Sequence, residues 1–167
     1  MNERKITEEV LAELRKLRGA VVLKHADRFT KGVPDLSVSV LGGTSWIELK
    51  YLRKKARLRD VVDTLQLTLC HELATTTNGR CWVVVFEEEP RRVTVWQPQA
   101  LFRHLWPRVA GPNPANPKWK HLGCAPVEIE NLEYGASLAG TLHAYGAFRV
   151  PGWPYDVVTK LVQSAVR

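Results

Sequence analysis

The stretch KGVPDLSVSVLGGTSWIELKYLRKKARLR, from Lys31 to Arg59, decides the fold of this chain. Pro34 favours an extended backbone before it, and residues 35–40 then alternate between polar and apolar side chains, as in a strand with one buried face. Gly42-Gly43 predicts a hairpin turn, and residues 45–52 predict the returning strand. The stretch therefore predicts an antiparallel strand pair that is followed by a run of cations.

Further elements are predicted on both sides of this pair from the spacing of apolar residues. They are a helix over residues 3–18, a strand over 20–25, a helix over 59–76, and strands over 81–88 and 92–98. The side chains expected on the buried face of the second helix are Val62, Leu65, Leu69 and Leu73. The continuous apolar run that begins at Cys81 predicts a strand buried on both faces. This order predicts an α/β fold with a mixed β-sheet flanked by helices.

The chain changes character after residue 106. Residues 107–117, PRVAGPNPANP, are rich in Pro, Gly and Asn and predict a linker or a long loop. The final stretch, residues 155–166, has helical spacing. We therefore expect a core over residues 1–106 and a C-terminal extension over 107–167 that packs on it. The role of the extension stays open between a cap on the core, a substrate-binding extension and a dimer element.

Length and charge bound the function classes. The 167 residues allow one domain with a sizeable core, and a 45% hydrophobic composition is that of an ordinary globular protein. The formal net charge of +7 favours a polyanionic partner such as nucleic acid, although many basic proteins bind none. No run of about 18 apolar residues occurs, and the charged N-terminal stretch is unlike a secretory signal, so no membrane partner is expected.

The cysteines indicate a reducing compartment. Cys70, Cys81 and Cys124 are odd in number and far apart, which predicts free thiols and a cytoplasmic location rather than a disulfide framework. His121 and Cys124 have the spacing of a zinc-ligand pair, but no second pair accompanies them, so no zinc site is predicted.

Three side chains of the opening stretch have the chemistry of a metal site. Glu48 and Lys50 are two residues apart in a predicted strand, so they point to the same face. Asp35 begins the partner strand, and its carboxylate can approach Glu48, where a divalent cation such as Mg²⁺ would neutralise both charges. A lysine there can contact the attacking water or the scissile phosphate. The alternative is a turn residue at Asp35 and a solvated strand face at Glu48 and Lys50.

Three further features favour the site, and each also has a purely structural explanation. Gln66 lies at the edge of the apolar face of its helix, where it can hydrogen-bond a metal-bound water or a base, or simply be a boundary residue. Glu3 falls near the middle of the apolar arc of the first helix, as a third acidic residue or only as a favourable charge at the helix N-terminus. The cations after the strand can hold phosphates or form an exposed loop. They are Arg53, Lys54, Lys55, Arg57 and Arg59.

The motif GVPD, which ends at Asp35, is followed by IELK with Glu48 thirteen residues later, by Gln66 on the next helix and by the apolar strand 81–86. This combination resembles the PD-(D/E)XK nuclease superfamily. Within it, the chain most resembles the VRR-NUC type, which is found in phages, bacteria and eukaryotic repair nucleases. The resemblance covers residues 3–88 and implies a restriction-endonuclease-like core.

The resemblance also implies a division of roles in the site. Asp35 and Glu48 would bind Mg²⁺ or Mn²⁺, with the Leu49 carbonyl as a further ligand. Lys50 would position or activate water, and Gln66 would support the site.

Glu3 matches the glutamate that opens the first helix of the family, whereas Thr7 stands where a glutamine is often seen. The residues that would contact the phosphate backbone of DNA are Lys24, His25, Arg28 and Lys31, together with the cations at 53–59. For Lys24, His25 and Arg28, the alternative is that they form a solvated strand end without contacting DNA. Stand-alone members of this type resemble small homodimeric nucleases that act on branched DNA, including four-way junctions. The resemblance therefore implies a phage or bacterial homodimer that works on DNA in a bacterial cytoplasm.

Three functions follow for comparison. The first is a metal-dependent DNA endonuclease, which the intact acidic residues favour. The second is a catalytically inactive module of the same fold that binds nucleic acid, for which eroded acidic residues would be expected. The third is a protein-interaction role, such as a small phage factor that blocks a host enzyme through aromatic residues of the extension, for which core packing is the alternative. Those aromatic residues are Trp119, Tyr134, Tyr145, Trp153 and Tyr155.

Overall fold

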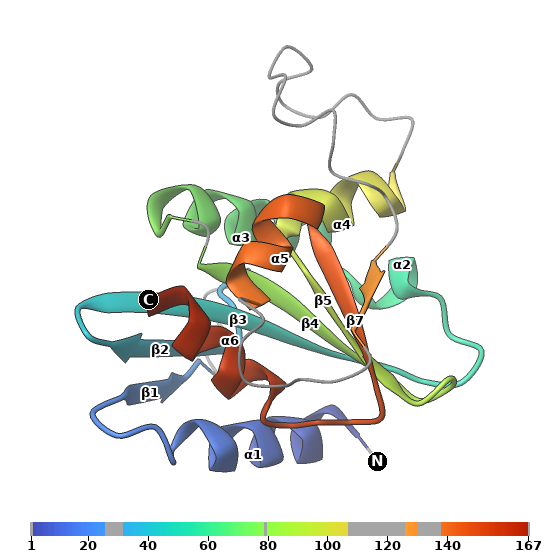
Figure 1. The fold of residues 1–167 in the computed structure, drawn as a ribbon. Helices are drawn as coiled ribbons and strands as arrows, with labels where there is room; N and C mark the ends of the chain where they lie inside the picture. The colour runs from blue at the N-terminus through green and yellow to red at the C-terminus, as the bar shows by residue number, and fades with distance from the viewer. Residues whose placement is uncertain (1, 26–31, 79, 107–125, 130–137, 167) are drawn as a thin grey trace.

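A mixed seven-stranded sheet organises the part of the chain that the computed structural model describes, residues 2–25, 32–78, 80–106, 126–129 and 138–166 (Figure 1). The strands are β1 Val21–Lys24, β2 Leu36–Val40, β3 Gly43–Leu52, β4 Cys81–Glu87, β5 Arg92–Trp96, β6 Val127–Glu128 and β7 Ala147–Pro151. Their order is β1-β2-β3-β4-β5-β7-β6, with β3–β4 and β6–β7 parallel and the other neighbours antiparallel. The predicted α/β class with a mixed sheet is confirmed.

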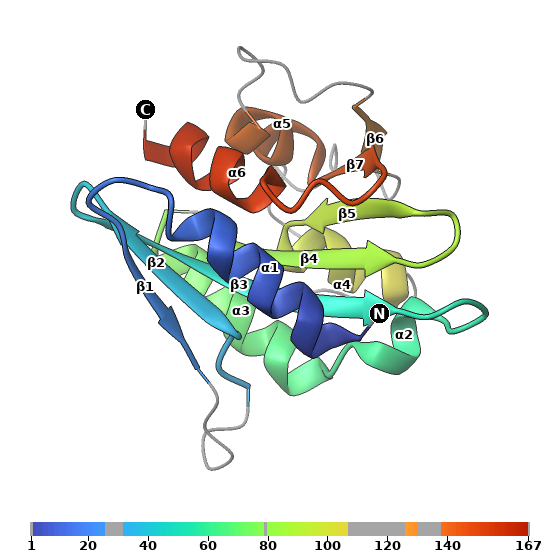
Figure 2. The same ribbon diagram turned by 90° about the horizontal axis from the view of Figure 1, so that it is seen from below.

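Helices cover both faces of the sheet. They are α1 Glu3–Leu14, α2 Leu58–Val61, α3 Thr64–Thr76, α4 Pro98–Leu105, α5 Leu138–Tyr145 and α6 Val157–Val166. On one face, α1, α5 and α6 share the larger apolar core, which includes Ile6, Leu142 and Leu161. On the other face, α3 and α4 enclose a smaller core around Leu67 and Leu101. Figure 2 shows α1 and α6 in front of the sheet, with α3 and α4 behind it. Within the described residues, no helix has the length and apolar character needed to cross a membrane.

The first helix ends at Leu14 rather than at residue 18. Asn2 caps its start by accepting a 2.9 Å hydrogen bond from the Lys5 N–H. After Leu14, the N–H groups of Lys16 and Leu17 donate to carbonyls three residues back, at 3.1 Å each. The helix therefore tightens into turns before β1 begins.

The β2–β3 hairpin is confirmed, but its turn lies one residue earlier than predicted. Leu41 and Gly42 have positive φ angles, 48° and 77°, as a two-residue hairpin turn of type I′ requires, and Gly43 is already in β3. A β-carbon at Gly43 would lie 1.5 Å from Nη1 of Arg80. The Nη2 of Arg80 donates a 2.8 Å hydrogen bond to the Ala165 carbonyl in α6. The absence of a side chain at Gly43 thus lets Arg80 pass beside the hairpin and reach α6.

The single helix predicted over residues 59–76 is wrong, because two helices occupy this stretch. Asp63 caps α3 by accepting a 2.7 Å hydrogen bond from the Leu65 N–H, and such a cap needs a non-helical chain before it. Val62 is accordingly extended, with φ −101° and ψ 119°. Of the predicted buried face, Val62 packs against the smaller core, but within α3 the prediction is wrong: the buried residues are Leu67 and Cys70, while Leu65 is 55% exposed. The helix packs on β4 and α4 through the side that carries Leu67, so the predicted leucines of α3 point away from the centre of the smaller core.

The strand that follows is buried on both faces, as predicted. Trp82, Val84 and Phe86 belong to the larger core, and Val83 and Val85 belong to the smaller one. Cys70 and Cys81 are buried free thiols, which agrees with the predicted reduced state of these two cysteines.

Residues beyond 106 contribute to the same sheet and the same core. β7 pairs with β5, and Phe148 of β7 lies in the larger core with Val158 of α6. The helix predicted over 155–166 is confirmed as α6, whereas α4, α5, β6 and β7 were not predicted. Trp153 and Tyr155 pack against the larger core, while Tyr145 is 52% exposed. The linker predicted over 107–117 lies outside the described residues, and so do Trp119 and Tyr134.

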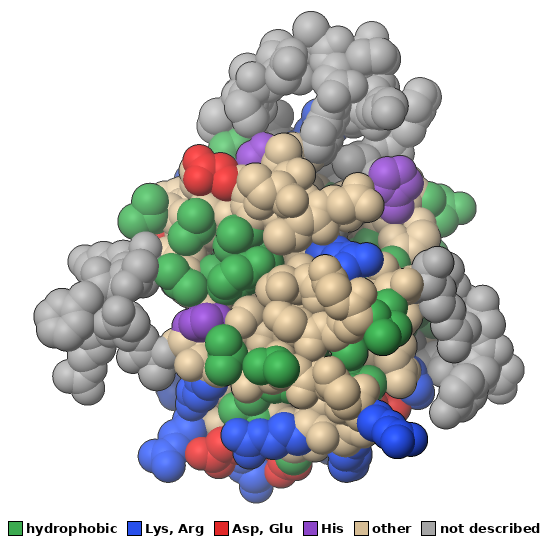
Figure 3. Space-filling model, turned by 90° about the vertical axis from the view of Figure 1, so that its left-hand side faces the viewer, with side chains coloured by type: hydrophobic (Ala, Val, Ile, Leu, Met, Phe, Trp, Pro, Cys, Tyr) green, Lys and Arg blue, Asp and Glu red, His purple; other side chains and the backbone are tan. Residues whose placement is uncertain are grey.

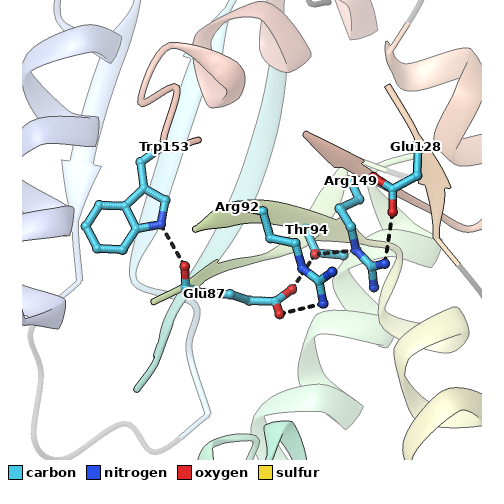
Figure 4. A network of polar contacts seen from close by, with 6 residues as sticks. All are labelled: Glu87, Arg92, Thr94, Glu128, Arg149 and Trp153. Atoms are coloured by element: carbon cyan, nitrogen blue, oxygen red, sulfur yellow. Dashed lines mark hydrogen bonds and ion pairs between the residues drawn. The ribbon is translucent and has the colours of Figure 1, made fainter. Parts of the chain in front are cut away.

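A polar network fastens these C-terminal strands to the centre of the sheet (Figure 4). Its members are Glu87, Arg92, Thr94, Glu128, Arg149 and Trp153. The buried Glu87 carboxylate lies 2.8 Å from Arg92 Nη2 and accepts a 2.7 Å hydrogen bond from the Thr94 hydroxyl. Trp153 Nε1 donates to the Glu87 carbonyl at 2.9 Å, and Arg149 pairs with Glu128 at 3.0 Å. The network joins β4, β5, β6 and β7.

Candidate active site

The candidate site lies where β2 and β3 stop pairing. The last paired residues at this end are Leu36 and Ile47, so Asp35 and Glu48 come next on opposite strands. Ile47 and Leu49 of β3 lie in the larger core. Glu48 therefore points to the opposite face, toward α3, and so does Lys50, as the alternation in the sequence predicts.

Backbone hydrogen bonds link the two carboxylates. The Leu49 N–H donates to Asp35 Oδ2 at 2.8 Å, and the Asp35 N–H donates to Glu48 Oε2 at 3.3 Å. These side-chain contacts continue the β2–β3 interaction past its last paired residues. Each carboxylate is thus held by the backbone of the strand that carries the other one. Asp35 is a member of this cluster rather than a simple turn residue.

Lys50 completes the cluster. Its Nζ lies 2.6 Å from Glu48 Oε1 and donates a 3.0 Å hydrogen bond to Gln66 Oε1 of α3. The side chains of Lys50 and Glu48 are only 12% and 2% exposed. The four predicted residues Asp35, Glu48, Lys50 and Gln66 therefore come together in a mostly buried cluster, and the alternative of a solvated strand face does not hold for Glu48 and Lys50.

Burial and mutual repulsion shape the charge of the site. Burial, followed by the charge of Asp35, raises the pKa of Glu48 from 4.5 to about 7, although Lys50 opposes the shift. Burial also raises the pKa of Asp35, against the hydrogen bond from Leu49 and the charge of Lys50. For Lys50, burial lowers the pKa, but the carboxylates of Glu48 and Asp35 outweigh it and hold the pKa above its ordinary value. The cluster accordingly has two carboxyl groups whose raised pKa values disfavour ionisation, and one lysine that stays protonated.

The residues present fit a divalent cation with oxygen ligands. Glu48 Oε1 is buried and, although it lies close to Lys50 Nζ, receives no well-directed hydrogen bond. The Leu49 N–H points to Asp35, and the carbonyl of a strand residue faces the same edge as its N–H, so the Leu49 carbonyl also faces this side. Mg²⁺ commonly takes one or two carboxylates and keeps several waters. No group of three or more His, Cys, Asp or Glu side chains within the described ranges forms a metal site, so a metal here would rest on two carboxylates.

Glu3 is exposed at the start of α1, rather than on the inward face where its helical position predicted it. The inward face of the first turn begins at Ile6, because Glu3 lies next to the cap at Asn2 and beyond the edge of the core. The charge of Glu3 nevertheless contributes to the raised pKa of Lys50, after Glu48 and Asp35. Glu3 is therefore near the site without a direct contact to its carboxylates among the hydrogen bonds described.

His25 is part of the sheet around the site. Its N–H donates to the Asp35 carbonyl at 2.8 Å, and its ring Nε2 lies 2.9 Å from Ser37 Oγ. The ring also stacks on Trp46, with centroids 5.4 Å apart and planes 26° apart. Sequence reasoning did not single out Ser37 or Trp46; the available signal was that both alternate onto the face of Asp35 and Glu48. Lys24, at the end of β1, contributes a charge that lowers the pKa of Asp35 against the larger effect of burial.

The cations at 53–59 are all exposed, and several have neighbours of their own. Lys54 Nζ lies 2.7 Å from a carboxylate oxygen of Glu89. Arg57 forms two 3.0 Å hydrogen bonds with Asp60, and Arg59 lies 5.7 Å from the centroid of the Trp106 ring. Exposed pairs of this kind contribute little stability, so they can exchange for phosphate contacts. Arg28 and Lys31, the other predicted DNA contacts, lie outside the described residues, as do His121 and Cys124.

Comparisons with family models and with curated proteins assign no function to the site. No protein-family model matches the chain, and no curated protein matches it. The features available for assigning a function are therefore the two linked carboxylates, the buried lysine and glutamine beside them, and the basic surface.

Proposed function

We propose that this protein is a metal-dependent DNA endonuclease that hydrolyses phosphodiester bonds. The observation that carries the proposal is the cluster in which the carboxylates of Asp35 and Glu48 meet the ammonium group of Lys50 at the edge of a strand pair. Burying two like charges together costs stability, and such clusters with shifted pKa values are concentrated at functional sites.

Asp35, Glu48 and the Leu49 carbonyl would hold Mg²⁺ or Mn²⁺. When bound, such an ion neutralises negative charge on a phosphoryl group and makes water a better nucleophile. The protein fixes the ligands in advance, because the Leu49 N–H holds Asp35 and the Asp35 N–H holds Glu48. Little reorganisation is then needed when a cation and a phosphate arrive.

Lys50 would supply a fixed positive charge. Since the neighbouring carboxylates keep its pKa above the ordinary value, Lys50 stays protonated at neutral pH. An ammonium group in this position can donate to a phosphate oxygen or orient the attacking water. Gln66 is a positioning residue, because it acts through its 3.0 Å hydrogen bond with Lys50.

The charge of the chain supports DNA as the substrate. The net charge is +7, and five exposed cations follow the strand that carries Glu48 and Lys50. Lysines and arginines near a phosphodiester cleavage site add affinity by releasing counterions from the DNA. We also propose that the protein acts on branched DNA, including four-way junctions, and that it works as a homodimer.

A catalytically inactive module that binds nucleic acid is the second candidate. The 2.6 Å contact between Glu48 and Lys50 favours it, because the lysine already neutralises the more buried carboxylate without a metal ion. Such a module would bind DNA with a steep salt dependence and would leave every strand intact.

The two candidates separate in a cleavage assay on a labelled panel of duplex, single strand, flap and four-way junction. Each DNA is incubated with Mg²⁺, Mn²⁺ or EDTA, and Lys50→Ala is run beside the parent protein. The endonuclease cleaves at least one substrate with a divalent cation, stops in EDTA, and loses about 100-fold or more of its rate in the variant, because the charge at the reacting phosphate is lost. Binding without cleavage by the folded parent protein, with either cation, would select the inactive module.

A further inference from the structure

A group of apolar side chains lies outside both cores, beside the candidate site. Val21 and Leu23 of β1 are 59% and 54% exposed, and Leu65 of α3 is 55% exposed. Trp46 and Leu69 are half-buried, yet they belong to neither of the two core clusters that the described residues form. Figure 3 shows hydrophobic side chains gathered on this side of the molecule, above the charged residues at its lower edge.

This group is continuous with the candidate site. Trp46 precedes Glu48 by two residues on the same face of β3, which is a separation of about 7 Å along a strand. Leu65 adjoins Gln66 in α3. Leu65 also lies close to Gly32, three residues before Asp35, since a β-carbon added at Gly32 would be 3.6 Å from Leu65 Cγ. A strand of DNA whose phosphate reached Glu48 and Lys50 would therefore extend over Trp46 in one direction.

The chemistry of this face suits a nucleobase better than a phosphate. The ring of Trp46 is already stacked on His25, and His25 is held by Ser37 and by the Asp35 carbonyl. Serine and threonine side chains interrupt the apolar residues, since Ser39 and Thr44 lie 2.9 Å apart on the same face. On the Trp46 side of Glu48, the described residues of this face in β1, β2 and β3 include no lysine or arginine, whereas Lys50 and the exposed cations lie on the other side of Glu48.

We propose that Trp46, stacked on His25, is the subsite for an unpaired nucleobase of the substrate. This inference rests on the proposed function and adds a substrate requirement to it. The DNA would carry its paired segment along the cations after Lys50 and an unpaired nucleotide on the Trp46 side of the scissile phosphate. Bases stack on aromatic side chains whatever their sequence, so the subsite would read strand structure rather than sequence.

The subsite is tested by binding in EDTA, where no cleavage complicates the measurement. The probes are a duplex with a short single-stranded arm, which has 2-aminopurine as its first unpaired base, and the fully paired duplex of the same sequence. Trp46→Ala is expected to weaken binding of the armed duplex about 5- to 100-fold and to leave binding of the paired duplex unchanged. Trp46→Phe keeps most of the affinity, and the loss in Trp46→Ala is the same at low and high salt because stacking releases no counterions.

Two further variants keep the test decisive. Tyr145→Ala removes an exposed aromatic ring from α5, on the opposite face of the sheet, and should change neither probe. Leu23→Ser removes exposed apolar surface on the same face as Trp46, two strands away, from a side chain that lies in neither core, and should weaken the armed duplex selectively if Trp46→Ala fails to fold. Equal losses for both probes in Trp46→Ala and Leu23→Ser, or no loss in either variant, would overturn the subsite.

Failure of the subsite and failure of the nuclease are distinguishable. Arm-selective binding that depends on Trp46, without cleavage in any metal, supports the subsite and removes the nuclease. Metal-dependent cleavage with no preference for an unpaired base keeps the nuclease and overturns the subsite. A change from dimer to monomer in Trp46→Ala, seen by light scattering, with equal losses for both probes would assign this face to contact between copies of the chain and would also overturn the subsite.

Discussion

At the scale of single residues, Glu48 has the most constrained position in the candidate site. It is 2% exposed, and it accepts a hydrogen bond from the N–H of Asp35, the residue that carries the second carboxylate. Among the ion pairs described, Glu48 contacts only one cation, Lys50. Regular pairing of β2 and β3 ends at Leu36 and Ile47, and beyond it the Leu49 N–H bonds the Asp35 carboxylate instead of a backbone carbonyl. This contact brings the two acidic side chains together. A site of this kind stores electrostatic repulsion that a divalent cation would relieve.

The raised pKa of Glu48 predicts a specific pH dependence of stability in the absence of divalent cations. A carboxyl group whose pKa rises from 4.5 to about 7 binds its proton more tightly in the folded state, so its contribution to stability falls as the pH rises through this range. The free energy of unfolding of the parent protein should therefore decrease between pH 5 and pH 8 by on the order of 2–3 kcal/mol more than that of Glu48→Gln. Urea unfolding at both pH values measures this difference, and parallel pH profiles for the two proteins would contradict it.

Much of the site can be predicted at the residue scale because strand alternation is a local rule. Period-two spacing places Glu48 and Lys50 on one face, and the hairpin brings Asp35 opposite Glu48. The position of Glu3 could not be predicted in the same way. Helical periodicity gives the direction of a side chain but not where the core ends, and Glu3 stands one turn beyond Ile6 at that edge.

At the scale of elements, the β2–β3 hairpin presents the site and leaves the space through which Arg80 reaches the C-terminal helix. Arg80 passes over Gly43 to reach the Ala165 carbonyl in α6. Sequence patterns predicted the hairpin but misplaced its turn by one residue, since two adjacent glycines are equally able to take a positive φ. The break between α2 and α3 was missed because the apolar spacing continues across Val62, whereas the cap made by Asp63 depends on a single side-chain hydrogen bond.

A double-mutant cycle at the hairpin tests this connection. Arg80→Ala should cost about 1 kcal/mol through the lost hydrogen bond to Ala165. Gly43→Ala should cost a similar amount, because the new methyl group displaces the guanidinium, so the double variant should be little worse than either single one. Gly42→Ala is the matched control: its φ of 77° makes it strained, but no atom lies within 4 Å of the added carbon, so its cost should add to that of Arg80→Ala. Additive costs at Gly43 would contradict the contact.

At the scale of the whole molecule, the C-terminal strands complete the sheet that presents the site. β7 pairs with β5 across a long sequence separation, with Thr94 beside Arg149. Local patterns cannot predict such a pairing, because β7 is five residues long and its partner is chosen by tertiary contacts. The Glu87 network lies where these strands meet (Figure 4).

The network should matter more for stability than its number of ion pairs indicates. Glu87→Ala leaves the Arg92 guanidinium without its carboxylate and the buried Thr94 hydroxyl without its acceptor, and should lower the free energy of unfolding by about 2–4 kcal/mol. Glu128→Ala removes a carboxylate that is 62% exposed and should cost about 1 kcal/mol or less. Urea unfolding of both variants provides the comparison. Equal costs would show that burial of Glu87 adds nothing to the network.

The most direct test of the central claim is the initial rate of DNA cleavage in Mg²⁺ by the parent protein and by Glu48→Gln. Glu72→Gln, which changes the same charge on the exposed side of α3, is the matched control. If Asp35 and Glu48 form the catalytic metal site, Glu48→Gln loses about 100-fold or more of the rate, because electrostatic stabilisation by the ion is worth several kcal/mol. Glu72→Gln keeps the parent rate. A folded Glu48→Gln that cleaves as fast as the parent protein would show that the chemistry, if present, lies elsewhere.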